Sequence, residues 1–116
     1  MNTIRQWNEL LEENGEHPPL DEAMCLMAHD EDPRICPAEL LNTLNTLTKK
    51  LYLPNPSDPF DCIARINLHL FQTHGFTGAV DDYYHPHNSQ LHYVLQKRKG
   101  IPISLSAVYM ETARKV

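Results

Sequence analysis

The sequence lacks the features that mark membrane, secreted and nucleic-acid-binding proteins. No apolar run approaches the roughly 18 residues of a membrane-spanning helix, and no basic start followed by an apolar block suggests a secretory signal. Residues 1–35 hold nine acidic and two basic residues, and residues 36–116 hold six and eight, so neither half is basic enough for nucleic acid. We therefore expect a cytoplasmic protein with no membrane or nucleic-acid partner.

Cysteine is also scarce, and its spacing excludes two classes of small domain. The three cysteines are an odd number and form no C-x-x-C pair, which argues against a disulfide framework and against a zinc finger. Cys25 and Cys62 fall on apolar faces of expected helices. We expect both to be buried free thiols.

Strand signals are missing, and helical periodicity takes their place. No stretch alternates with period two for long enough to predict a strand, and 116 residues suit one domain. The fold class is therefore predicted to be all-α, a single domain over residues 1–116. Apolar spacing, prolines and glycines predict about six helices, over residues 3–13, 20–30, 37–51, 59–74, 90–99 and from 102 onward.

Four of these helices form an N-terminal region, residues 1–74. The fourth, over residues 59–74, carries apolar residues around more than half its circumference, so we expect it to be the central and most buried helix. Gly75 is its expected C-terminal stop. In the remaining part, Asn88 or Ser89 is expected to cap the fifth helix and Gly100 to end it, and Pro102 suits the first position of the sixth.

The densest set of metal-ligand residue types is His85, His87 and His92, with Asp81 and Asp82 before them. Imidazole and carboxylate groups are good zinc or iron ligands. Histidines in a proline-containing loop more often only cap or solvate it, and aspartates commonly hold a turn. We therefore expect no metal and no cofactor, and these histidines remain weak candidates.

Two further groups have structural interpretations. Tyr83 and Tyr84 could stack on a ligand, but they are expected to pin their long loop onto the core. The basic run Lys97, Arg98 and Lys99 could contact phosphate or RNA. It also ends a helix, where cations complement the helix dipole, and this interpretation is preferred.

The start of the sixth helix is the natural place for a nucleophile. Ser104 and Ser106 lie there, but no Gly-x-Ser-x-Gly elbow is present and no histidine follows in the chain, so a hydroxyl that bonds first-turn amides is preferred. A cysteine would gain thiolate character from the helix dipole at this point. Pro102 stands there, and proline has neither a thiol nor a backbone N–H.

The run GFTGAVDDYYHPHNSQLHYVLQKRKGIPISLSAVYMETAR, residues 75–114, resembles the SirB-type branch of the transglutaminase-like superfamily. Before residue 75 the resemblance continues back to about residue 20, but it is looser there. It implies a helical N-terminal part and then, from residue 75, the start of a papain-like α+β core whose sheet lies beyond Val116. In the wider superfamily a Gly-x-Cys opens the core helix, and a histidine and an aspartate follow on later strands. Gly100 matches the glycine, and Pro102 falls on the position of the cysteine.

The resemblance thus implies a catalytically inactive fragment with a protein-interaction or regulatory role and an unidentified protein or peptide partner. The family-motif positions, to which structural roles are assigned, are Asp82, Tyr83, Tyr84, Asn88, Arg98, Gly100, Pro102 and Ser104. The alternative is part of a cysteine or serine acyl-transfer or hydrolytic enzyme whose other catalytic residues lie beyond residue 116. The apolar residues of the sixth helix would be covered by the later sheet, so we expect self-association through that C-terminal helix.

Overall fold

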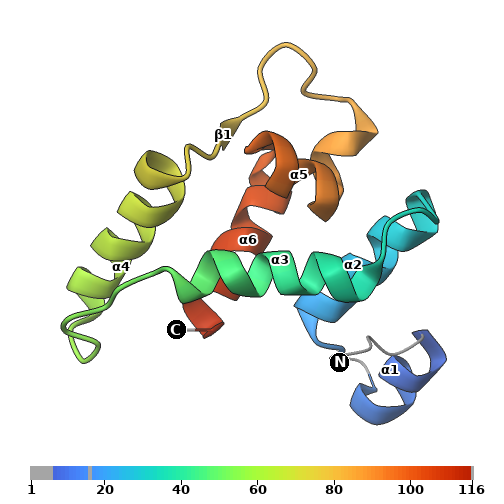
Figure 1. The fold of residues 1–116 in the computed structure, drawn as a ribbon, viewed down its shortest axis with the longest axis horizontal. Helices are drawn as coiled ribbons and strands as arrows, with labels where there is room; N and C mark the ends of the chain where they lie inside the picture. Colours follow the sequence, from blue (N-terminus) through green and yellow to red (C-terminus); the bar gives the residue numbers. More distant parts are fainter. Residues whose placement is uncertain (1–6, 16, 116) are drawn as a thin grey trace.

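A computed structural model describes residues 7–15 and 17–115, and within them the chain is largely helical (Figure 1). The predicted all-α class is confirmed. The six α-helices are α1 (Trp7–Asn14), α2 (Leu20–Glu31), α3 (Pro37–Lys49), α4 (Pro59–Asn67), α5 (Leu91–Lys97) and α6 (Pro102–Lys115). A π-helix, η1 (Leu68–Thr73), continues α4, and a 3-10 turn, η2 (Pro86–Ser89), precedes α5. No helix among the described residues is long and apolar enough to cross a membrane.

Several helix ends follow directly from local sequence. Pro37 and Pro59 occupy first-turn positions, where their missing N–H removes no helical bond. The carboxylate of Asp58 caps α4 by accepting the amides of Phe60 at 3.0 Å and Asp61 at 3.4 Å. Gly75 follows η1 with a φ of +71°, as expected of a glycine at a helix stop. The predicted start of the first helix, at residues 3–6, lies outside the described residues.

The core lies where α2, α3, α5 and α6 meet. Cys25, Leu44 and Val94 are fully buried there, and Val108 of α6 is 2% exposed. The prediction for Cys25 is confirmed, and burial, with a smaller contribution from the charge of Asp21, raises the pKa of its thiol to about 12. Cys62 is only half-buried, so the prediction of a second buried thiol is wrong.

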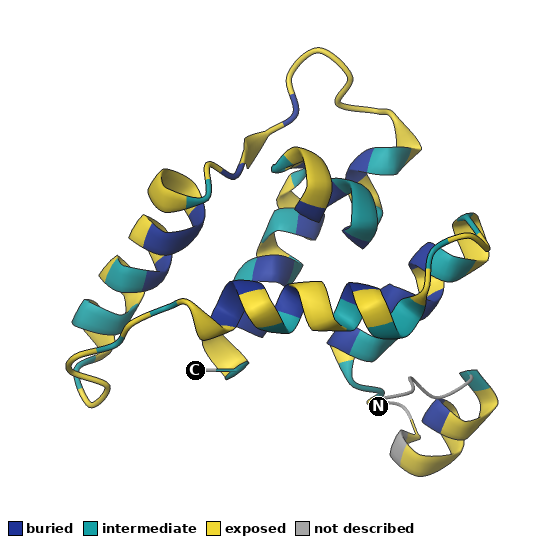
Figure 2. Ribbon diagram, viewed as in Figure 1, coloured by how far each residue is buried: buried dark blue, intermediate teal, exposed yellow. Residues whose placement is uncertain are grey.

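The prediction that the fourth helix is central is also wrong. α4 and η1 lie at the periphery (Figures 1 and 2), and only a narrow stripe that includes Ile66 and Leu70 is buried. Phe60 is 82% exposed and Ile63 50% exposed. An apolar circumference predicts burial only if other elements surround the helix, and here the described neighbours cover one side.

The structure contains two short strands that the sequence did not predict. β1 (Thr77–Gly78) pairs in parallel with β2 (Lys99–Gly100), joined by bonds from the Thr77 amide to the Arg98 carbonyl at 2.9 Å and from the Ala79 amide to the Gly100 carbonyl at 2.8 Å. Two residues are too few to show alternation. The pair brings the loop after η1 beside the start of α6.

α5 begins and ends differently from the prediction. Gln90, not Asn88 or Ser89, is the residue before its first turn, and it makes no side-chain cap bond. The helix ends at Arg98, which adopts the left-handed conformation at φ 59°, so Gly100 is not the stop. Both predicted roles are therefore corrected, whereas Pro102 does begin α6 as expected.

Candidate functional site at the start of α6

The candidate site lies where β2 leads into α6, at the turn that sequence analysis singled out. Gly100 is buried within the short parallel pair, Ile101 is half-buried, and Pro102 is exposed as the first residue of the helix. A helix of this length offers first-turn amides and a positive dipole end at its start. The side chains around that end decide what chemistry it can support.

Ser104 is 5% exposed, and its hydroxyl is fully engaged with main-chain groups. It donates to the carbonyl of Asn88 at 2.6 Å and accepts the amide of Ile101 at 3.1 Å, and the Ile101 carbonyl lies 3.1 Å away as an alternative acceptor. These hydrogen-bond partners within the described structure include no histidine that could act as a base. The hydroxyl therefore holds the turn before α6, since it bonds the main chain of Ile101 and of Asn88.

Gly100 is required by close approach and not by its φ. A Cβ at this position would lie 2.6 Å from the Oγ of Ser104 and 3.3 Å from the Cδ2 of Leu105. No real Cβ approaches an oxygen so closely, so any larger residue must displace the serine. Gly100 and Ser104 therefore form one packed unit.

Asn88 fixes the preceding loop to this unit. It is 1% exposed, and its Nδ2 donates to the main-chain carbonyls of Asp82 and Tyr83, while its own carbonyl accepts the Ser104 hydroxyl. Tyr83 and Tyr84 are 43% and 93% exposed, so the prediction that they anchor the loop is wrong. The short amide is the better anchor because it can satisfy two carbonyls from inside the turn.

Asp82 and the nearby histidines stabilise the loop in a different way. The Nε2 of His87 donates to the Asp82 carboxylate at 2.8 Å, and this bond holds the pKa of Asp82 below its ordinary value. The His87 ring stacks between those of His85 and Tyr93, with both centroid separations at 3.6 Å. Nδ1 of His85 accepts the His87 amide at 3.1 Å.

The metal candidates His85, His87 and His92 line one pocket, but their nitrogens are not arranged as a ligand set. The rings of His85 and His87 are stacked, so their nitrogens lie in nearly parallel planes and do not point at a common centre. One nitrogen of each ring is already engaged in a hydrogen bond within the loop. No group of three or more His, Cys, Asp or Glu that could hold a metal occurs in the described parts of the chain.

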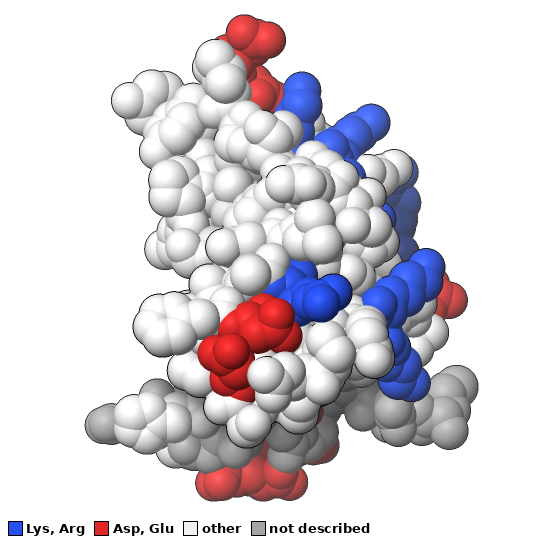
Figure 3. All heavy atoms as spheres, turned by 90° about the vertical axis from the view of Figure 1, so that its left-hand side faces the viewer, with Lys and Arg blue, Asp and Glu red and all other residues white. Residues whose placement is uncertain are grey.

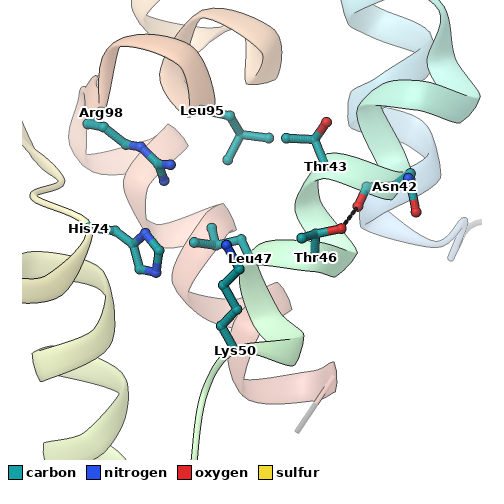
Figure 4. A pocket seen from close by; sticks show the side chains of 8 residues that line it. All are labelled: Asn42, Thr43, Thr46, Leu47, Lys50, His74, Leu95 and Arg98. Carbon is teal, nitrogen blue, oxygen red and sulfur yellow. Dashed lines mark hydrogen bonds between the residues drawn. The ribbon is translucent and has the colours of Figure 1, made fainter.

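The structure therefore brings together Asn88, Gly100, Pro102 and Ser104, with Asp82 joined through its carbonyl. Arg98 departs from this group: its side chain reaches into a pocket between α3, η1 and α5 (Figure 4). His74 lines the same pocket, and sequence analysis did not select it. The signal that could have found it is its position directly before Gly75, where the helix ends and the side chain turns inward.

A sequence model described as the transglutaminase-like superfamily matches residues 38–116, which is more than half of the chain. The chain belongs to the transglutaminase-like superfamily. This family match begins in α3 and contains the whole unit of Asn88, Gly100 and Ser104. The superfamily level of the resemblance is thus confirmed.

The chain also resembles two kinds of longer protein. The chain is 36% identical over 114 residues to UPF0162 proteins of two Xylella fastidiosa strains, Temecula1 and 9a5c, and the match covers 95% of the chain but 40% of those proteins. It is 43% identical over 51 residues to F-box only protein 21 of Mus musculus, over 44% of the chain and 8% of that protein. The chain therefore spans less than half the length of these relatives. No solved structure matches it significantly.

Proposed function

We propose that this transglutaminase-like chain is of the SirB type, is catalytically inactive, and acts by binding a protein partner. The carrying observation is Pro102 at the first position of α6, two residues after Gly100. A nucleophilic cysteine at such a helix start would gain thiolate character, and proline supplies neither sulfur nor an N–H for an oxyanion.

Three other possible nucleophiles do not replace the missing cysteine. The hydroxyl of Ser104 is committed to Asn88 and Ile101, as described above. The thiol of Cys25 is fully buried in α2, and its raised pKa, about 12, keeps it protonated at neutral pH. Cys36 is exposed and lies directly before α3, away in sequence from the start of α6.

A binding role is supported by the apolar residues that the described structure leaves exposed on α4 and α6. Phe60 and Ile63 of α4 are 82% and 50% exposed, and Ile103 and Met110 of α6 are 72% and 61% exposed. Figure 3 shows that the face on the α4 side has a broad area without charged side chains, with acidic and basic groups side by side in its lower middle and further Lys and Arg along one edge. Large apolar side chains that stay exposed are candidates for contact with another protein.

We propose that the partner is a second copy of this chain, which packs against the C-terminal helix α6. Ile103 and Met110 are seven residues apart, which is two helical turns, so they lie on one stripe that an identical helix can match in an antiparallel pair. Another protein or peptide on the same stripe is the competing outcome of the test.

Catalytic inactivity is tested with electrophilic probes for serine and cysteine nucleophiles, applied to the intact protein. We expect no labelling that depends on Ser104, and alkylation of cysteine only at the rate of an ordinary exposed thiol such as Cys36. Probe labelling that Ser104→Ala abolishes would refute the proposal. Rapid labelling of a residue outside residues 1–116 would instead favour the acyl-transfer or hydrolytic enzyme.

Binding through α6 is tested by sedimentation at increasing protein concentration. The double variant Ile103→Glu/Met110→Glu should shift the protein to the monomer, because charge in an apolar contact must be desolvated. Val80→Glu is the matched control, since Val80 is 86% exposed but lies in the loop after β1. A wild-type protein that stays monomeric throughout would exclude the second copy as occupant.

A further inference from the structure

A pocket of about 270 Å³ lies between the end of α3, the end of η1 and the end of α5 (Figure 4). Leu47 and Leu95 give it apolar walls, and Arg98, His74 and Lys50 stand around one side. None of its lining residues is acidic; they are Asn42, Thr43, Thr46, Leu47, Lys50, His74, Leu95 and Arg98. We call this the basic pocket.

The cations of the basic pocket have no carboxylate partner in the described parts of the chain. Among the described residues, no ion pair joins Lys50 or Arg98 to an acidic side chain, although Arg34, Arg65 and Arg114 all have one. The guanidinium of Arg98 instead lies over the ring of Phe76, 4.9 Å from its centroid. A guanidinium has its N–H donors in its own plane, so a contact of its carbon with an aromatic ring leaves donors free to bind an anion.

Three main-chain carbonyls beside the pocket do not depend on these two cations. Leu47 accepts from Nε2 of His69 at 2.7 Å, and Val94 accepts the Arg98 amide at 2.9 Å. The carbonyl of Thr48 accepts the Leu51 amide at 3.1 Å. The side chains of Lys50 and Arg98 are therefore not needed to satisfy these groups.

Two unusual backbone segments meet at the same place. Arg98 is the one non-glycine residue with positive φ in the described chain, a conformation that costs a side-chain-bearing residue free energy. η1 is a π-helix, a form that recurs at functional sites because the extra residue redirects a side chain. Together they aim Arg98 and His74 at one cavity.

The pKa of His74 depends on its burial and on the charges around the pocket. Its ring packs edge-on against His69, with centroids 4.5 Å apart. Burial first, and then the charges of His69, Arg98 and Lys50, lower its pKa. An anion bound among these groups would oppose the last two contributions, so that binding and protonation of His74 favour each other.

We propose that the basic pocket binds the phosphate group of a small phosphorylated ligand, with Arg98 and Lys50 as charged contacts and His74 as an additional donor. A phosphate monoester carries a charge near −2 at neutral pH, which matches two fixed cations, whereas a monocarboxylate leaves one of them unpaired. Leu47 and Leu95 then contact a short apolar part of the ligand. The cavity is smaller than that of a drug-sized ligand, which limits that part to about one ring.

The test titrates the protein with phenyl phosphate, inorganic phosphate and benzoate by calorimetry. We expect phenyl phosphate to bind more tightly than inorganic phosphate, because its ring covers the leucines, and benzoate to bind at least about tenfold more weakly than phenyl phosphate. Benzoate binding as tight as that of phenyl phosphate, or no saturable binding of either phosphate, would overturn the proposal.

The variant is Lys50→Gln/Arg98→Asn, in which asparagine tolerates the left-handed conformation of residue 98. We expect it to lose about tenfold or more in affinity for phenyl phosphate. The control is Lys49→Gln/Lys97→Gln, which removes the same charge from the same two helix ends at residues that do not line the pocket. Equal losses in both variants would mean that a diffuse field attracts the anion, and would overturn the site.

A second readout follows the ring resonances of His74 by NMR as pH is varied. Bound phosphate should raise the pKa of His74 relative to the free protein, and Lys50→Gln/Arg98→Asn should abolish that rise. An unchanged pKa of His74 in the presence of saturating phenyl phosphate would contradict the proposed contact.

Discussion

The two faces of α6 reverse the usual relation between polarity and burial. Three of its four buried residues are polar, namely Ser104, Glu111 and Thr112, whereas Ile103 and Met110 are 72% and 61% exposed. Val108 is the buried apolar residue of this helix, and Leu105, Ala107 and Tyr109 pack against the core while partly exposed. The orientation of the helix therefore serves both its buried polar side chains and these apolar contacts, and it leaves Ile103 and Met110 outside.

Each buried polar side chain of α6 has a partner that offsets its desolvation. The Thr112 hydroxyl donates to the Val108 carbonyl at 2.8 Å, and the Glu111 carboxylate pairs with the Arg114 guanidinium at 2.7 Å. An unsatisfied group in such a place would cost more than an exposed methyl group gains from burial. The exposed face has no such constraint, which is why it is free to serve as a contact surface.

The first prediction tests the polar face at its C-terminal end. Nζ of Lys115 lies 2.6 Å from Oδ2 of Asp21, and both side chains are largely buried. Lys115→Met should lower the free energy of unfolding by about 2 kcal/mol, less than for a fully isolated pair because Arg114 still lies 3.2 Å from the same oxygen. Urea unfolding measures it, with Lys97→Met on the exposed end of α5 as control; equal midpoints for the two variants would contradict the prediction.

The same ion pair predicts how stability changes with acid. Burial alone would raise the pKa of Asp21, but bonds from Lys115 and the Glu22 amide, with the charges of Lys115 and Arg114, hold it below its ordinary value of 3.8. The unfolded chain therefore binds this proton first, so the stabilisation is complete above pH 3.8 and is lost as pH falls through the lower folded pKa.

Lys115→Met should consequently lose less stability than the wild type over that acid range. Unfolding in urea at a series of pH values measures both slopes. Parallel curves for the two proteins would show that Asp21 does not carry this part of the acid dependence.

At the N-terminal end of the polar face, we expect the stability effects of Gly100 and Ser104 substitutions to be coupled. Gly100→Ala should destabilise by about 2 kcal/mol, because its Cβ must displace Ser104. Ser104→Ala should cost about 1 kcal/mol through its lost bonds to Asn88 and Ile101. The double variant should cost less than the sum, since the clashing Oγ is gone, and additive losses in a thermal-unfolding cycle would contradict the contact.

The helical spacing of apolar residues and the positions of proline and glycine predicted most of the helices. α2 and α3 begin at the predicted residues, and α6 begins at Pro102, because proline geometry and helical apolar spacing are local properties. The burial of α4 was not predictable in this way, since Phe60 and Ile63 have the same periodic signal as Ile66. Which part of an apolar circumference is covered depends on neighbours that the local pattern does not contain.

The contacts around the start of α6 were not predicted from the sequence. Gly100, Pro102 and Ser104 were selected, yet the glycine serves close packing, and Asn88 anchors a loop through bonds to residues five and six positions away. The parallel pair of β1 and β2 joins residues 22 apart, and the left-handed Arg98 lies directly before β2. Such features arise from tertiary contacts, so a single-sequence pattern gives no signal for them.

The smallest predicted effect tests the exposed face of α6. Ile103→Ala and Met110→Ala should each change the free energy of unfolding of the monomer by less than about 0.5 kcal/mol, because truncating an exposed side chain opens no cavity. Val108→Ala on the same helix removes two buried methyl groups and should cost about 2 kcal/mol. Urea unfolding at low protein concentration measures all three. If instead Ile103→Ala or Met110→Ala costs as much as Val108→Ala, the face is covered within one chain, and the contrast between the two faces of α6 is lost together with the proposed interface.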